Sequence, residues 1–265
     1  MKNNYSLSIA IPTYNSSKYL ASCISSVINF KVVDEIVVHD DNSDELEFKK
    51  IKKIIDKYVD KINIKLYKNK KNYGAFINKY ENIRKCSNDL VYQLDSDNIS
   101  GPEIDNIFYK ISKSNNKDFL YLPSKIYQFY NFPKAAMYAS KVNKKYKVTY
   151  TKSDFVFTKD ILNEAIKENS KFTVDKNINW ILNSGNFIVH KKSYTEVMES
   201  EIDFNIRYPL DAVAISYFWI ANGKNIKTLQ NLYHFHRKRS NSVSFTENAG
   251  SYDSLQNFRN KFLEL

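Results

Sequence analysis

The fold of this chain is decided near its start, where residues 8–15 read SIAIPTYN. The run of small and apolar residues ends at Pro12, which cannot donate a hydrogen bond inside a central strand ladder. The stretch therefore predicts a buried strand over residues 8–11 and a turn after it. Ser16 or Ser17 then caps a helix whose apolar residues recur at helical spacing.

The same alternation continues to residue 122. Apolar runs at residues 35–39, 64–67 and 90–94 predict three more strands, and apolar residues at helical spacing predict a helix after each of them. Strands that alternate with helices form a mostly parallel, Rossmann-like sheet with right-handed crossovers and helices on both faces. The sequence therefore predicts the α/β class, in which ligands bind at the carboxyl ends of the strands.

Beyond residue 122 the pattern becomes mixed α+β. No Gly-, Ser- or Pro-rich linker separates the two halves. We therefore expect one domain with a nucleotide-binding half at 1–122 and an acceptor-side half at 123–245, followed by an amphipathic helix at 246–265. Within the second half, strands are predicted at residues 147–151 and 186–190, and helices at residues 161–168, 193–200 and 210–222.

The composition is that of a folded globular protein, with 43% hydrophobic and 26% charged residues among 265. Lys and Arg total 40 against 29 acidic residues, and the resulting net charge of +11 favours an anionic partner. Nucleic acid, a membrane face and a charged small substrate all meet that description. The abundance of Lys, Asn and Ile is equally typical of an AT-rich genome, so the charge alone does not identify the partner.

The sequence also indicates a cellular location. Cys23 and Cys86 are the only cysteines, which are too few for a disulfide framework. No apolar stretch approaches the ~18–20 residues that cross a bilayer, and the first residues carry no long apolar signal region. We therefore expect a cytoplasmic protein, and a peripheral contact of its basic surface with an anionic membrane stays open.

Asp95 and Asp97 directly follow the predicted strand at residues 90–94, with Ser96 between them. Two carboxylates at the carboxyl end of a strand can share a divalent cation, and hard oxygen ligands suit Mn²⁺ or Mg²⁺. Aspartates also end strands and begin turns, so this triplet alone is a weak signal.

Asp40 and Asp41 end the predicted strand at residues 35–39 in the same way. A carboxylate at this place can accept the N–H of a pyrimidine ring or bind ribose hydroxyls, and we assign that role to Asp41. The alternative is a capped turn, because Ser43 or Asp44 suits the N-cap of the helix that follows.

Four motifs, taken together and in this order, are specific. They are IAIPTYN at residues 9–15, IVVHDDNS at 36–43, NYG at 72–74 and LDSD at 94–97. The combination resembles glycosyltransferase family 2, which has the GT-A fold. The resemblance implies an inverting transferase that moves a sugar from a nucleoside diphosphate, UDP above all, to a hydroxyl of a glycan or lipid-linked glycan. It also implies a Mn²⁺ or Mg²⁺ cofactor and a place in surface polysaccharide or lipopolysaccharide synthesis.

The resemblance also implies roles for individual residues. Asp211 is the implied general base, because it lies at the start of a predicted helix of the second half, although the usual Glu before this Asp is absent. Asp97, Asp95 and His236 are the implied metal ligands. The implied contacts to the donor nucleotide come from Pro12, Thr13, Tyr14, Asn15, Asp41, Asn72, Gly74, Asp95, Ser96 and Arg237.

Other assignments at these positions stay open. Asp211 also suits the first turn of a helix, where a carboxylate complements the macrodipole. His236 and Arg237 belong to a basic stretch that suits a departing diphosphate but equally suits a solvated loop. The turn at residues 183–186 and Trp180 are expected beside the acceptor, although a lone Trp more often packs in a core.

Two other functions compete with this one. A metal-dependent nucleotidyltransferase needs a glycine-rich phosphate loop near the first strand, and residues 11–15 provide none. A non-catalytic binder of nucleic acid or of an anionic surface would use the +11 charge and the many aromatic residues. That function leaves the acidic motifs at the strand ends unexplained, so we expect no nucleic-acid partner.

Overall fold

A computed structural model describes residues 6–114, 116–130, 147–149, 151–167, 182–208, 210–238 and 260. The strands are β1 (Leu7–Thr13), β2 (Val33–Asp40), β3 (Asn63–Lys68), β4 (Leu90–Gln93), β5 (Ile99–Ser100), β6 (Phe119–Tyr130), β7 (Lys147–Thr149), β8 (Phe155–Phe157), β9 (Phe187–His190) and β10 (Asn225–Lys238). The helices are α1 (Ser17–Ser25), α2 (Glu45–Ile55), α3 (Ala75–Lys85), α4 (Ile104–Ser114), α6 (Lys159–Lys167), α8 (Lys191–Glu201) and α9 (Asp211–Ala221).

Within the described residues, the strands form one mixed sheet in the order β3-β2-β1-β4-β9-β6-β10-β5, with β7 beside β6 and β8 beside β10. The first four strands of that order pair in parallel, as the alternating pattern predicts. β9 is antiparallel to both β4 and β6, and it joins the regular half of the sheet to the mixed half. β6 runs across residue 122, so both expected halves share this sheet.

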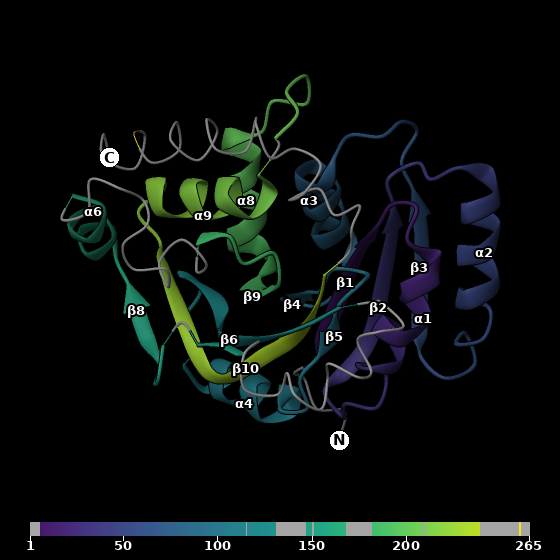
Figure 1. The fold of residues 1–265 in the computed structure, drawn as a ribbon, viewed down its shortest axis with the longest axis horizontal. Helices are drawn as coiled ribbons and strands as arrows, with labels where there is room; N and C mark the ends of the chain where they lie inside the picture. Colours follow the sequence, from purple (N-terminus) through teal and green to yellow (C-terminus); the bar gives the residue numbers. More distant parts are fainter. Residues whose placement is uncertain are drawn as a thin grey trace.

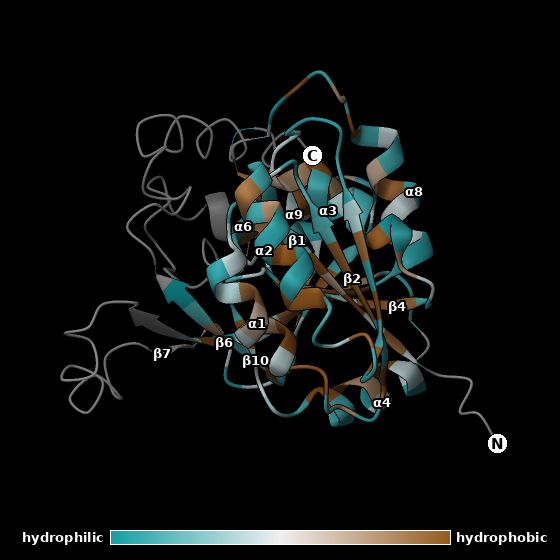
Figure 2. Cartoon of the chain, turned by 90° about the vertical axis from the view of Figure 1, so that its right-hand side faces the viewer, coloured by the Kyte–Doolittle hydropathy of each residue, from teal (hydrophilic) through white to brown (hydrophobic). Residues whose placement is uncertain are grey.

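Helices cover both faces of the sheet (Figure 1). One apolar core lies under α3, α8 and α9, and a second lies on the opposite face under α1, α2 and α4. The strands β1 and β2 are buried almost throughout, which explains their near-continuous apolar sequence. Figure 2 shows the complementary pattern on α2, whose outward residues are largely hydrophilic.

The first strand extends further than the sequence predicts. β1 continues through Pro12 to Thr13, and Pro12 is paired with His39 of β2. Ala10 and Pro12 face the same neighbouring strand, β4, because backbone polar groups alternate sides along a strand. The pairing with β4 ends at Ala10, so the missing N–H of Pro12 interrupts no ladder.

The second half matches the prediction in part. β7, β9, α6, α8 and α9 lie at the predicted places, with ends shifted by a few residues. The long strands β6 and β10, which pair in parallel, were not predicted as strands of that length. Trp180 and the helix expected at 246–265, apart from Asn260, lie outside the described residues.

Two expectations about the chain as a whole can be compared with the structure. Cys23 and Cys86 are both buried and free, in agreement with the absence of a disulfide framework. Across the described ranges, no helix combines the length and the apolar character that spanning a membrane requires.

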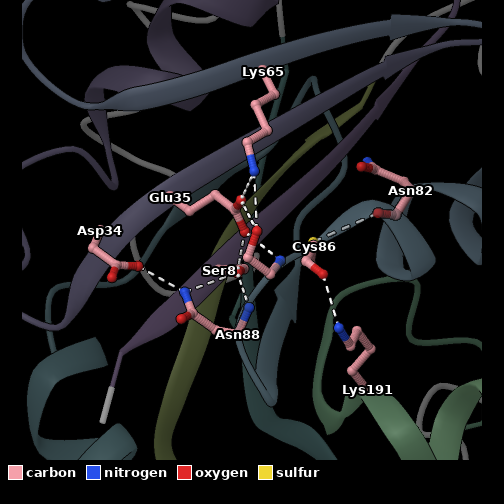
Figure 3. Close-up of polar contacts among 9 residues, drawn as sticks. Ser8, Asp34, Glu35, Lys65, Asn82, Cys86, Asn88 and Lys191 are labelled. Carbon is pink, nitrogen blue, oxygen red and sulfur yellow. Dashed lines mark hydrogen bonds and ion pairs between the residues drawn. The ribbon is translucent and has the colours of Figure 1, made fainter. Parts of the chain in front are cut away.

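The buried carboxylate of Glu35, paired with the partly exposed Lys65, fastens the amino-terminal ends of the parallel strands (Figure 3). Glu35 of β2 accepts hydrogen bonds from Ser8 of β1 at 2.5 Å and from Lys65 of β3 at 2.6 Å. The backbone N–H and the hydroxyl of Ser87, just before β4, also donate to Glu35, at 2.7 and 2.8 Å. One carboxylate thus ties four consecutive parts of the sheet together.

Candidate active site

The turns that follow β1 and β2 are pinned to each other. Asn15 donates its backbone N–H to Ser43 Oγ at 2.8 Å, and its side-chain amide exchanges hydrogen bonds with Asp44. Asn15 and Asn42 both have positive φ, 46° and 63°, a conformation that asparagine tolerates better than most residues. This arrangement leaves Tyr14 49% exposed at the end of β1.

A chain of hydroxyl groups connects the end of β1 to the acidic triplet. Thr13 Oγ1 lies 2.7 Å from Ser16 Oγ, which in turn lies 2.7 Å from Ser96 Oγ. Ser16 is the N-cap residue of α1, yet its side chain makes no capping bond. The sequence predicts a capping role for Ser16 or Ser17, and the structure instead directs the Ser16 hydroxyl to the site.

The Asp41 carboxylate organises the loop that carries Gly74. One oxygen accepts the backbone N–H of Tyr73 at 3.0 Å and the amide of Asn69 at 2.8 Å, and the other accepts the N–H of Gly74 at 2.8 Å. Asn72 belongs to the same loop and is half-buried. Asp41 itself is buried, and its hydrogen bonds hold this loop against the end of β2.

Asp40 has a different task from its neighbour. Its carboxylate accepts the backbone N–H of Ser43 at 2.9 Å and also the Ser43 hydroxyl. Burial raises the pKa of Asp40, and the bonds from Ser43 oppose that rise. The structure therefore separates a turn-forming Asp40 from a loop-holding Asp41.

Asp95 is fixed by groups from three elements. Its backbone N–H donates to Asn186 Oδ1 at 2.7 Å, and its Oδ1 accepts from Gln93 Nε2 at 3.2 Å and from Lys79 Nζ at 2.9 Å. Burial raises the pKa of Asp95 to about 6, with Asp211 adding to the rise and Lys79 opposing it. The expected turn at residues 183–186 therefore does meet the acidic triplet, through Asn186.

Lys79 is the centre of the cluster. Its ammonium group lies 2.9 Å from Asp95 Oδ1, 2.6 Å from Asp211 Oδ2 and 3.1 Å from the carbonyl oxygen of Gly185. The side chain is buried, and burial alone would lower its pKa, but the two carboxylates raise the pKa above the usual lysine value. A charged ammonium group is therefore built into the site.

Gly185 is required by this packing. A Cβ on Gly185 would lie 2.8 Å from Asp95 Oδ2 and 2.9 Å from Lys79 Nζ, which is closer than real Cβ atoms approach. The absence of a side chain at Gly185 thus makes room for the Lys79 to Asp95 ion pair.

Asp211 is the first residue of α9, as the sequence predicts for the base. The helix is almost entirely buried beyond this residue, so the backbone around Asp211 is anchored by core packing. Leu210 precedes it directly, while Pro209 lies outside the described residues. Lys79 brings Asp211 of the second half next to Asp95 of the first half.

Arg237 lies at the other side of the acidic triplet. Its backbone N–H donates to Asn98 Oδ1 at 3.1 Å, and its Nε donates to the carbonyl oxygen of Asp97 at 3.1 Å. The guanidinium carbon is 4.8 Å from the centre of the Tyr19 ring of α1. Arg237 is thus held at the carboxyl ends of the strands, where a diphosphate is expected.

His236 and His234 lie on the same side of β10, with ring centres 6.1 Å apart. His234 is buried, and its pKa is lowered well below the usual value by burial, by His236 and by Lys79. The alternating pattern of residues 233–236 predicts that both imidazoles share one side of the strand, and the ring contact agrees with this.

The carboxyl-end edge of the sheet could bind a divalent cation together with the phosphates of a ligand. Across the described ranges, no three His, Cys, Asp or Glu side chains form a group that could hold a metal by themselves, so Asp95, Asp97 and His236 are not gathered into one. Mg²⁺ and related cations commonly take one or two carboxylates and complete their shell with substrate phosphates and water. The hard oxygens of Asp95 and Asp97 suit a cation that arrives with a diphosphate.

The site residues inferred from the sequence do not include Lys79, Gln93 or Ser16, and they include Gly185 only as part of the expected turn at residues 183–186. Lys79 lies on a helix next to Asn78, and nothing in its neighbourhood distinguishes it from a solvated lysine. Its role is visible only once the elements are packed together.

Comparison with known structures shows which fold this is. TarS 1–349 of S. aureus in complex with UDP superposes with a TM-score of 0.60 at 17% identity, over 89% of this chain and 61% of that one. GalNAc-T7 with UDP, GalNAc and Mn²⁺ superposes with a TM-score of 0.61 at 15% identity, over 88% of this chain and 43% of that one. At these identities the similarity concerns the fold, which is the GT-A fold of glycosyltransferases.

Sequence comparison gives the family. An uncharacterized glycosyltransferase of Mycoplasma genitalium is 32% identical over 115 residues, which are 42% of this chain and only 39% of the relative. The model of the glycosyl transferase family 2 matches residues 8–165, which is more than half of the chain and includes the four motifs. With the GT-A architecture and these motifs in place, the chain belongs to glycosyltransferase family 2.

Proposed function

We propose that this protein transfers a sugar from a nucleoside diphosphate, UDP in the first place, to a hydroxyl group of a glycan or lipid-linked glycan acceptor, with inversion at the anomeric carbon. The observation that carries the proposal is the cluster of Asp95, Lys79 and Asp211, which joins a donor-side carboxylate to an acceptor-side carboxylate. The UDP complexes of two proteins with this fold support the choice of nucleotide.

Asp211 is the proposed general base. A sugar hydroxyl is a poor nucleophile, and a carboxylate that accepts its proton in the transition state contributes roughly 10² to 10⁴ in rate. The acceptor oxygen forms a bond to the anomeric carbon while the bond from that carbon to the diphosphate breaks. The proton goes to Asp211, and the electron pair leaves with the nucleotide.

The proposed donor-binding residues lie at the ends of β1 and β2 and, with Arg237, on β10. Tyr14, Asn15 and the loop that Asp41 holds surround the expected nucleoside position at the ends of β1 and β2. Arg237 supplies fixed positive charge for the diphosphate, where negative charge develops as the bond breaks. A bound Mn²⁺ or Mg²⁺ at Asp97 would supply further charge neutralisation at the leaving diphosphate.

The acceptor and the biological setting belong to the same proposal. We place the protein in the cytoplasm, where it takes part in surface polysaccharide or lipopolysaccharide synthesis. Its net charge of +11 supports a peripheral contact with an anionic membrane, which would bring it close to lipid-linked acceptors.

The test is a thermal-shift titration with UDP, GDP, CDP and TDP, each with Mn²⁺ and with EDTA. A ligand that binds only the folded state raises the melting temperature by mass action. We expect a Mn²⁺-dependent rise with UDP that Asp97→Ala abolishes. Asp118→Ala is the matched control, because Asp118 pairs with Lys224 on the surface away from the site. The proposal would be contradicted if the melting temperature rose without dependence on Mn²⁺ and Asp97, or if it did not rise with any nucleotide.

A further inference from the structure

The ammonium group of Lys79 has as many acceptors as it has protons to donate. Its three N–H groups match Asp95 Oδ1, Asp211 Oδ2 and the Gly185 carbonyl oxygen, at 2.9, 2.6 and 3.1 Å. The Lys79 side chain is only 4% exposed, so water does not compete for these contacts. Because desolvation offsets much of the attraction in a buried ion pair, these contacts are weak evidence for added stability.

The four residues come from four different parts of the fold. Lys79 belongs to α3, Asp95 follows β4, Gly185 precedes β9 and Asp211 begins α9. The acceptor-side carboxylate and the donor-side carboxylate therefore have one shared neighbour. Without Lys79, Asp95 would keep its contacts with Asn186 and Gln93, whereas Asp211 would lose its ion-pair partner.

The partners of Asp211 are few. In the part of the chain that the structure describes, Lys79 is its only side-chain hydrogen-bond or ion-pair partner, and the contact uses Oδ2. The Asp211 side chain is 24% exposed, so it is held by Lys79 and still partly accessible to solvent. Lys79 thus fixes Asp211 through Oδ2 without burying the whole carboxylate.

The position of Lys79 is itself set by the donor-side loop. Gly74 is the N-cap residue of α3, and Asp41 holds its N–H. One turn along the helix, Asn78 donates its amide to the carbonyl oxygen of His39 at 3.0 Å. The helix that carries Lys79 is therefore fastened at both points to the end of β2, where the nucleoside is expected.

We propose that Lys79 is a positioning residue. Its ammonium group holds the base Asp211 at a fixed position relative to the donor-side carboxylate Asp95, so that the base is aligned with the bound donor. This inference rests on the proposed function, since it gives Asp211 the role of base. Lys79 acts through Asp211 and Asp95 and does not touch the substrate.

The test uses Lys79→Met, Asp211→Asn and the double variant, with UDP binding and the slow hydrolysis of UDP-GlcNAc and UDP-glucose as readouts. We expect Lys79→Met to keep the Mn²⁺-dependent affinity for UDP within about threefold and to lose about 100-fold in turnover, as Asp211→Asn does. Because both changes disable one unit, the double variant should be no slower than either single variant. Ethylammonium should restore part of the turnover to Lys79→Ala.

Lys191→Met is the control, because Lys191 donates to the Cys86 carbonyl oxygen at 3.0 Å at the opposite end of the sheet. It should keep full turnover. Parallel losses of UDP affinity and turnover in Lys79→Met, losses that multiply in the double variant, or unchanged turnover in Lys79→Met would each overturn the proposal.

A second readout separates this inference from the proposed function. If the unaltered protein neither binds UDP nor hydrolyses UDP-sugars, the proposed function fails, and the unfolding of the same four proteins in urea still decides the role of Lys79. Lys79→Met and Asp211→Asn should then be non-additive in stability, because Lys79→Met leaves Asp211 beside Asp95 without a cation. Additive effects would remove the coupling on which the proposal depends.

Discussion

Asp41 and Gly74 are joined by a hydrogen bond of 2.8 Å from the backbone N–H of the glycine to the carboxylate. Gly74 has a φ of +89°, a conformation that other residues adopt only with strain. The same carboxylate holds Tyr73 and Asn69. The family resemblance implies a role for Asp41 in nucleoside binding, and the structure adds that Asp41 shapes the loop at residues 69–74.

Asp41→Asn tests the loop-holding role. The amide can offer only one oxygen, and its NH₂ group would face a backbone N–H, so one buried donor loses its acceptor. We expect a loss of about 1–3 kcal/mol in the free energy of unfolding. The affinities for UDP and for CDP should fall by the same factor. Parallel titrations with both nucleotides measure this.

The control for this change is Asp44→Asn, since Asp44 is exposed and its carboxylate accepts a hydrogen bond from the Asn15 amide at 3.1 Å. It should leave stability nearly unchanged. If Asp41→Asn instead keeps its stability and binds CDP more tightly than UDP, then Asp41 contacts the base directly.

Gly185→Ala should damage the centre of the site. The added methyl group would lie 2.8 Å from Asp95 Oδ2 and 2.9 Å from Lys79 Nζ, so the ion pair must separate or the turn must shift. We expect a loss of about 1–3 kcal/mol in stability and at least tenfold in UDP-sugar turnover. Urea unfolding and a coupled assay of UDP release measure the two effects.

Gly223→Ala provides the comparison for Gly185→Ala. Gly223 has a positive φ of 72°, but an added methyl group would meet open space there, so the change costs backbone strain of about 1 kcal/mol and creates no clash. Its turnover should match the unaltered protein. Equal turnover losses in both variants would show that the close packing at Gly185 is not what matters.

The strand-end motifs could be predicted because the chain marks strand ends locally. Pro12 stops an apolar run, and Asp41 and Asp95 come at or just after the ends of apolar runs, so their common edge follows from the rule for parallel strands. The family resemblance suggests Asp211 as the base, while the local pattern predicts only a helix from residue 210, which the structure shows beginning at Asp211. These positions needed no knowledge of distant contacts.

The contacts made by Lys79 could not be predicted in this way. Its partner Gly185 lies 106 positions away, and Asp211 lies further still, so no local pattern relates them. The long parallel pair of β6 and β10 was missed for a similar reason, because their strands are separated by most of the second half. Patterns of periodicity indicate which face is buried, but they do not indicate which distant strand covers it.

Glu35 gives the fold a defined response to acid. Burial alone would raise its pKa, but the hydrogen bonds from Lys65, Ser8 and Ser87 outweigh burial and hold the pKa below the ordinary value of 4.5. A carboxylate with a lowered pKa contributes stability that is complete above 4.5 and is lost as the pH falls through the folded-state pKa. Stability should therefore decline as the pH falls below about 4.5.

Glu35→Gln tests this response in urea unfolding at several pH values between neutrality and about pH 3. We expect the variant to lose about 1–3 kcal/mol near neutral pH and to show a flatter pH dependence below 4.5. Glu45→Gln is the control, because Glu45 is exposed and its pairing with Lys49 at 3.7 Å contributes little. A variant curve that runs parallel to that of the unaltered protein would assign the acid response to other carboxylates.

Arg237 makes contacts that lysine cannot reproduce. Its Nε donates to the Asp97 carbonyl oxygen, and its flat guanidinium group lies over the Tyr19 ring, so it is held in place while still carrying charge toward the expected diphosphate. A lysine has no Nε–H and no planar group to stack. We expect Arg237→Ala to lose roughly tenfold or more in affinity for UDP, and Arg237→Lys to recover only part of that loss. Neither change should alter the affinity for uridine.

Calorimetric titration with UDP and with uridine distinguishes these effects. Arg84→Ala serves as the control, because Arg84 is exposed and paired with Glu81. If uridine weakens as much as UDP, Arg237 supports the acidic triplet rather than the diphosphate, and the positive charge for the leaving group must come from elsewhere in the site.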